Sequence, residues 1–110
     1  MPRESLGLLQ GTVDVLILKT LSWKPLHGYG ISEFIRMQTG GDLAVEDAAL
    51  YQALHRLERK ALVDSEWGVS DANRRARIYS ITAAGRKQLR TEVVELRRYM
   101  AALFRVLDPA

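Results

Sequence analysis

The last quarter of the chain carries a spacing of apolar residues that only a long helix can use. Successive apolar positions are 4, 3, 4, 3 and 4 residues apart, and they are Leu89, Val93, Leu96, Met100, Leu103 and Leu107. This spacing is a heptad seam over nearly three repeats. Because threonine is a favoured N-cap residue, we predict a helix that is capped by Thr82 and ends at about Leu107, roughly 38 Å long.

Such a helix is longer than a domain of 110 residues needs, so part of it must overhang. Val94, Tyr99, Phe104 and Val106 lie off the seam and add more apolar surface than proteins usually leave in water. The helix can dock on its own domain, or it can pack against a second copy of the chain, and both can hold at once. Since symmetric pairing is the commonest way to cover such a surface, we expect a homodimer formed through the seam residues.

Three shorter helices are predicted before this one. Apolar residues at helical spacing predict a first helix with Thr12 as its N-cap, buried on most sides. Pro25 interrupts the pattern, since proline cannot continue a helix. A second helix is expected over about residues 28–38, ended by Gly40 in the left-handed conformation. A third is expected over about residues 46–60.

The third predicted helix has two different faces. Its apolar face carries Leu50, Leu54, Leu57 and Ala61. The opposite face is polar and cationic at 3.6 residues per turn, and it carries Ala48, Gln52, His55, Arg56 and Arg59, with Tyr51 at the border. Taken alone, this face is also what an ordinary solvated helix presents to water.

A β-hairpin is predicted after the third helix. The segment LVDSEW alternates apolar and polar residues, ARIYSI forms a second strand, and GVSDANRR is a turn between them. Arg74, Arg75 and Arg77 cluster at the end of this turn with no carboxylate among them. Such a cluster indicates a negatively charged partner outside the chain. Taken alone, it fits an ordinary solvated turn equally well.

Three helices followed by a hairpin are the layout of a winged helix-turn-helix. The predicted fold class is therefore mainly α with a small β-hairpin, with a DNA-binding domain in residues 1–81 and a dimerisation helix in residues 82–110. A helix held by its apolar side can offer the other side to the major groove. We expect Gln52, His55, Arg56 and Arg59 to meet bases or phosphates, and the arginines of the turn to contact the DNA backbone or minor groove.

Composition narrows the remaining classes of function. The formal net charge is +3 and there is no cysteine, which excludes disulfides and cysteine-ligated zinc. His27 and His55 lie far apart without acidic residues or histidines at ligand spacing, and no nucleophile lies near a base. We therefore predict no metal, no cofactor and no enzymatic activity. With neither a signal peptide nor an apolar run that could span a membrane, a cytoplasmic protein is expected.

Several segments match one known family in the right order. They are GTVDVLILKTL, LHGYGI, LYQALHRLERKALV, EW and NRRARIYSITAAGRKQL, followed by the terminal helix. From about Leu8 to its end, the chain resembles the PadR family of winged-helix transcriptional regulators. The resemblance implies a homodimeric repressor of the compact subgroup, with one C-terminal helix, that binds a near-palindromic double-stranded operator. It also implies release by a small aromatic or hydrophobic effector, as in some members.

The chain departs from that family at the third helix. Where the family usually reads Ser or Thr, Leu, Tyr, Pro, Ala, Leu, this chain lacks the hydroxyl at Ala49 and has Gln52 in place of proline. Tyr51 is retained, and by resemblance it contacts the DNA backbone alongside Ala49. Leu96 stands where compact members often have a tryptophan that lines a ligand pocket. The alternative that Ala49 leaves open is a winged-helix protein-interaction module without DNA binding.

Overall fold

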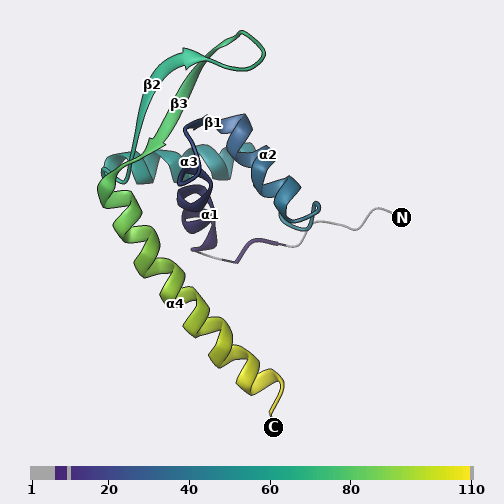
Figure 1. Cartoon of the computed structure of the whole chain (residues 1–110). Coiled ribbons are helices and arrows are strands. Elements are labelled where there is room, and N and C mark those ends of the chain that lie inside the picture. The colour runs from purple at the N-terminus through teal and green to yellow at the C-terminus, as the bar shows by residue number, and fades with distance from the viewer. Residues whose placement is uncertain (1–6, 10, 110) are drawn as a thin grey trace.

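The computed structural model describes residues 7–9 and 11–109. The beginning of the chain, on which the expected absence of a signal peptide depends, lies largely outside these residues. Within them, four helices and a three-stranded antiparallel sheet confirm the predicted fold class (Figure 1). Their order and bounds are α1 (Thr12–Leu21), β1 (Leu26–His27), α2 (Gly28–Gln38), α3 (Asp47–Arg59), β2 (Val63–Val69), β3 (Arg75–Ile81) and α4 (Ala83–Leu107).

Helix α1 forms the centre of the hydrophobic core, because α2, α3 and the first part of α4 all pack against it. Its Ile17, Leu18 and Leu21 are almost completely buried. The other elements contribute large buried side chains, namely Ile31, Ile35, Leu50, Leu54, Leu57, Val63, Tyr79 and Leu89. Burying each large aliphatic side chain contributes about 1.5–3 kcal/mol, so the three-helix core holds α3 firmly by its apolar side.

The predicted N-cap of α1 is wrong by one residue. Gly11 is the cap residue, with a φ of 87°, and it makes no side-chain cap hydrogen bond. The Thr12 hydroxyl instead donates to the carbonyl oxygen of Leu9 at 2.6 Å. Glycine adopts the left-handed region without steric cost, and here that backbone turn starts the helix where we expected a hydroxyl to do so.

The second and third helices lie where the sequence predicts them. Gly40 follows the end of α2 with a φ of 59°, which confirms its predicted left-handed conformation. The assignment of Ala61 to the apolar face of α3 is wrong, because the helix ends at Arg59 and Ala61 is exposed with a φ of 59°. This left-handed residue turns the chain from α3 into β2.

Strands β2 and β3 form the predicted hairpin, which we call the wing. In their register Trp67 lies opposite Arg77, and Ser65 lies opposite Tyr79. The sequence did not predict the third strand, β1, which pairs Leu26 with Tyr79. Two residues are too few to show an alternating pattern, yet they fix the start of α2 beside the wing.

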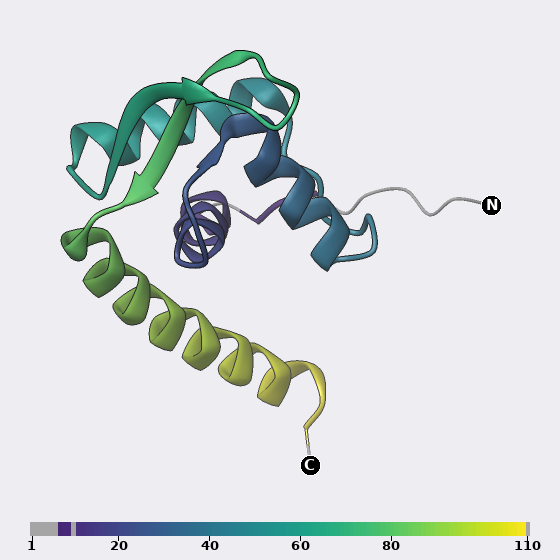
Figure 2. The ribbon, with the colours of Figure 1, turned by 45° about the horizontal axis from the view of Figure 1, so that its top comes forward.

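Helix α4 has the predicted length and cap, with the Thr82 hydroxyl accepting the N–H of Gly85 at 3.0 Å. Its first half docks on its own domain, where Leu89 is buried and Val93 and Leu96 pack against the core. Its second half runs past α1 and stands apart from the other elements in both views (Figures 1 and 2). The seam is therefore divided between contacts within the chain and a free apolar end.

Candidate nucleic-acid interface

The outward side of α3 is exposed, as its spacing predicts. Opposite the buried Leu50, Ala53, Leu54 and Leu57, the accessible residues are Ala48, Ala49, Gln52, His55 and Arg59. Their side chains belong to a helix that the core holds from behind, so their positions relative to one another are fixed by the helix backbone. A helix presented in this way has the geometry for reading a groove.

Arg56 differs from its neighbours on α3, because it lies on the flank that faces α1. Its guanidinium Nη2 is 2.6 Å from the carboxylate Oδ1 of Asp14. The side chain of Arg56 is 43% exposed and that of Asp14 is 20% exposed, so the ion pair is only partly hydrated. The sequence explains Asp14 through the dipole of α1 and gives no signal of this pairing.

The tip of the wing is a tight turn that exposes two of its arginines. The N–H of Ser70 donates to the carbonyl of Arg74 at 2.8 Å, and Asn73 adopts a φ of 58°. Asparagine tolerates this left-handed conformation better than most residues. Arg74 and Arg75 therefore project from a hydrogen-bonded turn, and both are exposed.

Arg77 connects the wing to the end of α3. Its Nε donates to the Ser65 hydroxyl at 2.9 Å, and that hydroxyl donates to Oε2 of Glu58 at 2.7 Å. The guanidinium of Arg77 also lies 3.9 Å from the same carboxylate oxygen. This network fixes the base of the wing relative to α3.

The start of α2 borders the same region, and sequence reasoning missed its contribution. Tyr29 is 70% exposed there, one residue after Gly28. Gly28 lets Tyr51 of α3 approach closely, since a Cβ on Gly28 would lie 2.6 Å from the Tyr51 hydroxyl oxygen. The signal available in the sequence was an aromatic residue placed directly after a helix N-terminus in HGYG.

These elements enclose a cleft of about 590 Å³ between α2, α3 and the wing. Its lining includes Tyr29, Tyr51, Arg74, Arg75 and Arg77. An adjoining hollow is bordered by His55 and Arg59 of α3 and by Arg77 and Tyr79 of the wing. The two hollows share Arg77 and Tyr79, and together we call them the concave surface between α3 and the wing. His55 and Arg59 of α3 and the three wing arginines line it, whereas Gln52 faces outward without lining either hollow.

Tyr79 is buried and lines both hollows. Burial raises the pKa of its phenol, and the nearby carboxylate of Glu58 raises it further. Both effects favour the neutral phenol over the phenolate. The exposed charges at this surface come mainly from arginines, with Glu58 as the acidic exception.

Two further features are absent from the part of the chain that the structure describes. Among residues 7–9 and 11–109, no group of three histidine or acidic residues could hold a metal ion. Over the same part of the chain, no helix combines the length and the apolar character needed to span a membrane.

A three-helix core, a hairpin wing and an exposed third helix beside it define the winged-helix class, in which many transcriptional regulators are found. The family model described as "Transcriptional regulator PadR-like family" matches residues 17–91. The chain therefore belongs to the PadR-like family of transcriptional regulators, and the predicted resemblance is confirmed.

Similar proteins agree with this assignment. A protein of unknown function from Lysinibacillus sphaericus is 34% identical over 80% of this chain and 81% of its own length. The structure of a transcriptional regulator from Clostridium thermocellum is 30% identical with a TM-score of 0.78, covering 86% of this chain and 91% of that one. Bacillus subtilis PadR, solved with operator DNA, is 18% identical with a TM-score of 0.67 and covers 76% and 47% of the two chains, so it supports the fold alone.

Proposed function

We propose that this chain is a homodimeric, sequence-specific repressor that binds a near-palindromic double-stranded DNA operator. The observation that carries the proposal is the shared concave surface of α3 and the wing. His55 and Arg59 of α3 border it together with Arg77 of the wing. Cationic side chains on two converging elements suit a polyanion that passes between them. Membership of a family of transcriptional regulators also supports it.

Each predicted contact residue has a role in this proposal. On α3, Gln52, His55 and Arg59 face outward and would meet base edges, while Arg56 would reach DNA only from the flank where it pairs with Asp14. Residues at the rim would meet phosphates, which position the protein without reading sequence. They are Tyr51, Arg74, Arg75 and Arg77, and we add Tyr29 at the start of α2. Ala49, exposed on α3, would meet a phosphate beside Tyr51.

Dimerisation would use the second half of α4, so that residues 1–81 bind DNA and residues 82–110 join the two copies. Tyr99, Phe104 and Leu107 are 63%, 51% and 61% exposed there. Of the predicted seam residues, Leu89 is already buried in its own chain, whereas Met100, Leu103 and Leu107 remain accessible. An apolar surface of this kind is normally covered by a partner.

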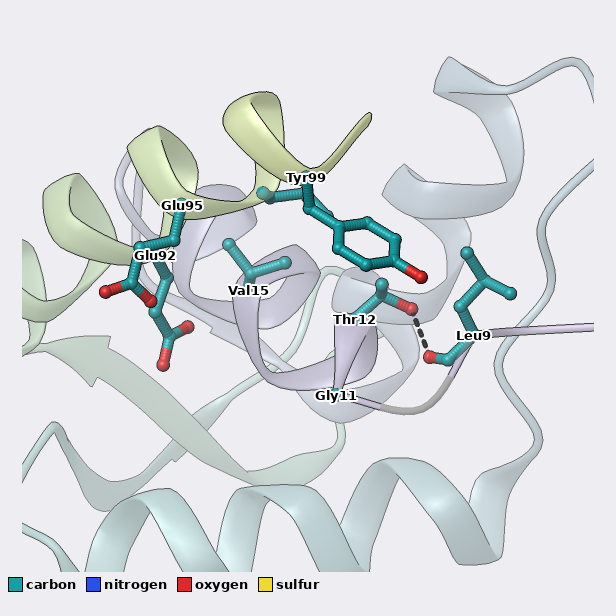
Figure 3. Close-up of a pocket in the computed structure, with 8 residues that line it drawn as sticks. Leu9, Gly11, Thr12, Val15, Glu92, Glu95 and Tyr99 are labelled. Carbon is teal, nitrogen blue, oxygen red and sulfur yellow. Dashed lines mark hydrogen bonds between the residues drawn. The ribbon is translucent and has the colours of Figure 1, made fainter. Parts of the chain in front are cut away.

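We place α4 of the second copy in a groove between α1 and α4 (Figure 3). It has a volume of about 560 Å³, and its lining includes Val15, Leu96 and Tyr99 with Glu92 and Glu95 at one side. The exposed end of α4 carries Arg97, Arg98 and Arg105. Apolar side chains and opposite charges would thus meet across a symmetric contact.

Release by a small hydrophobic or aromatic effector is the regulatory part of the proposal. Such a ligand would compete with the second copy for the groove between α1 and α4, where Leu96 and Val15 provide apolar walls. A compound that binds only the native protein raises its melting temperature. A thermal screen with planar aromatic compounds therefore tests this part without DNA.

The experiment for the whole proposal is selection from a random duplex library, followed by footprinting of the intergenic region upstream of the chain's own gene. We expect a symmetric motif whose half-sites lie one helical turn, about 34 Å, apart. Sedimentation at micromolar concentration should give a dimer. If no duplex is enriched at moderate salt while the protein stays dimeric, the alternative of a protein-interaction module without DNA binding replaces the proposal.

A further inference from the structure

Trp67 is a large aromatic side chain in the middle of β2, yet 57% of it is exposed. Ser65 lies directly opposite Tyr79 in the antiparallel register, and Trp67 is two residues along β2 from Ser65. Trp67 therefore lies on the same face of the wing as the buried Tyr79. Arg77 is its direct cross-strand partner, and Arg75 is the diagonal one. Both arginines can therefore reach the indole from the neighbouring strand.

Both guanidinium groups do contact the ring. The Cζ atom of Arg75 lies 4.5 Å from the centroid of the Trp67 ring, and that of Arg77 lies 5.4 Å from it. These distances are within the range of about 6 Å in which a cation is attracted to an aromatic face. Tryptophan is the side chain that gives the strongest such contact.

The two arginines are restrained to different degrees by the rest of the chain. Arg77 is also bonded to Ser65 and lies near Glu58, so α3 contributes to its position. For Arg75, the described residues contain no ion pair, and its side chain stacks on the indole of Trp67. Arg74, one residue away, does not stack on the indole and provides an internal comparison.

Stacking leaves the arginines free to bind anions. A guanidinium group stacks through its flat face, while its N–H donors point outward in the plane. An arginine that is already ordered also loses less side-chain entropy when it binds a phosphate. We propose that Trp67 is a positioning residue that holds Arg75 and Arg77 ready for DNA phosphates, an inference that rests on the proposed DNA binding.

The test compares Trp67→Leu with the conservative Trp67→Phe in titrations of a selected duplex over a range of salt concentrations. Because the side chain is more than half exposed, both variants should fold, which thermal melting checks. We expect Trp67→Leu to weaken binding about fivefold to tenfold and Trp67→Phe to restore most of the loss. In an Arg75→Ala/Arg77→Ala background, Trp67→Leu should have no further effect.

A second measurement needs no DNA. Proton NMR of the free protein should show side-chain protons of Arg75 and Arg77, but not of Arg74, shifted by the indole ring current, and Trp67→Leu should remove the shift. If Trp67→Leu leaves the DNA affinity unchanged, this inference is overturned while the proposed function stands. The same holds if Trp67→Leu weakens binding equally in the background that lacks both arginines. If the wild-type protein binds no duplex at all, the proposed function fails and this inference fails with it.

Discussion

Arg56 of α3 and Asp14 of α1 form an ion pair whose nitrogen and oxygen atoms lie 2.6 Å apart. The pair links the helix that we expect to enter the major groove with the helix at the centre of the core. Asp14 is the more buried partner, with 20% of its side chain exposed. Its carboxylate therefore neutralises one positive charge at the side of the proposed DNA surface.

Replacing the carboxylate should release that charge. We expect Asp14→Asn to lower the free energy of unfolding by about 1 kcal/mol or less, as for other partly exposed pairs. The same change should strengthen binding to nonspecific duplexes and steepen the salt dependence by up to about one phosphate contact. Fluorescence titrations at several salt concentrations measure both the affinity and the slope.

A matched control removes the same charge elsewhere. Asp108 follows the last residue of α4 and is exposed, far along the chain from α3. Asp108→Asn changes the net charge by the same amount as Asp14→Asn. Because Asp108 does not pair with Arg56, its replacement should leave the salt slope unchanged. Equal slopes for Asp14→Asn and the wild-type protein would show that Arg56 does not reach DNA when it is released.

The wing should contribute affinity without sequence preference. Arg74 and Arg75 project from its turn, and both line the cleft beside α3. We expect Arg74→Ala combined with Arg75→Ala to weaken binding to every duplex and to lower the salt slope by about two. A gel-shift titration in which neither quantity changes contradicts the wing's role. Replacing Lys60, which is exposed at the end of α3, provides a comparison for the loss of a nearby cation.

Gln52 should affect sequence preference more than overall affinity. It is exposed on the outward side of α3, and a glutamine can bond to adenine through two hydrogen bonds. We expect Gln52→Ala to lose about 1–3 kcal/mol of discrimination at one base pair of each half-site. Binding to nonspecific DNA should stay the same. Identical selected motifs from the two proteins would exclude Gln52 as a reader of bases.

The architecture could be predicted because local signals coincide with the elements. Thr82 and the heptad spacing define α4, and the 3.6-residue period of α3 separates its buried and exposed sides. In each case a side-chain pattern over several turns reports the surface on which the element packs. The same reasoning failed at Ala61, where a left-handed residue ends the apolar pattern of α3.

The details of the site depend on contacts between distant residues. Asp14 and Arg56 are 42 positions apart, and nothing in the spacing around either one indicates the other. Trp67 lies ten positions before Arg77, and only the strand register places the two residues opposite each other. Such pairings depend on tertiary packing, which sequence periodicity alone does not report.

The free end of α4 should control assembly. Phe104 is 51% exposed and lies in the half of the helix that stands apart from the core. We expect Phe104→Ala to weaken the dimer by about 2 kcal/mol, or about 30-fold in Kd, because less apolar surface is buried on pairing. Sedimentation velocity over a range of concentrations measures this. Met37→Ala, at an exposed position of α2, should leave the dimer unchanged.

Gly85 should be needed for the close packing of the start of α4 against the residues that flank the wing. A Cβ at this position would lie 2.1 Å from the carbonyl oxygen of Leu62 and 2.8 Å from Cγ1 of Ile81. The first of these is a backbone atom, so relieving the clash requires α4 to move away from the sheet. We expect Gly85→Ala to lower the free energy of unfolding by about 1–3 kcal/mol, measured by urea denaturation. Gly7→Ala has nothing within 4 Å of the added Cβ and should be neutral; equal stability of the two variants would contradict the close packing at Gly85.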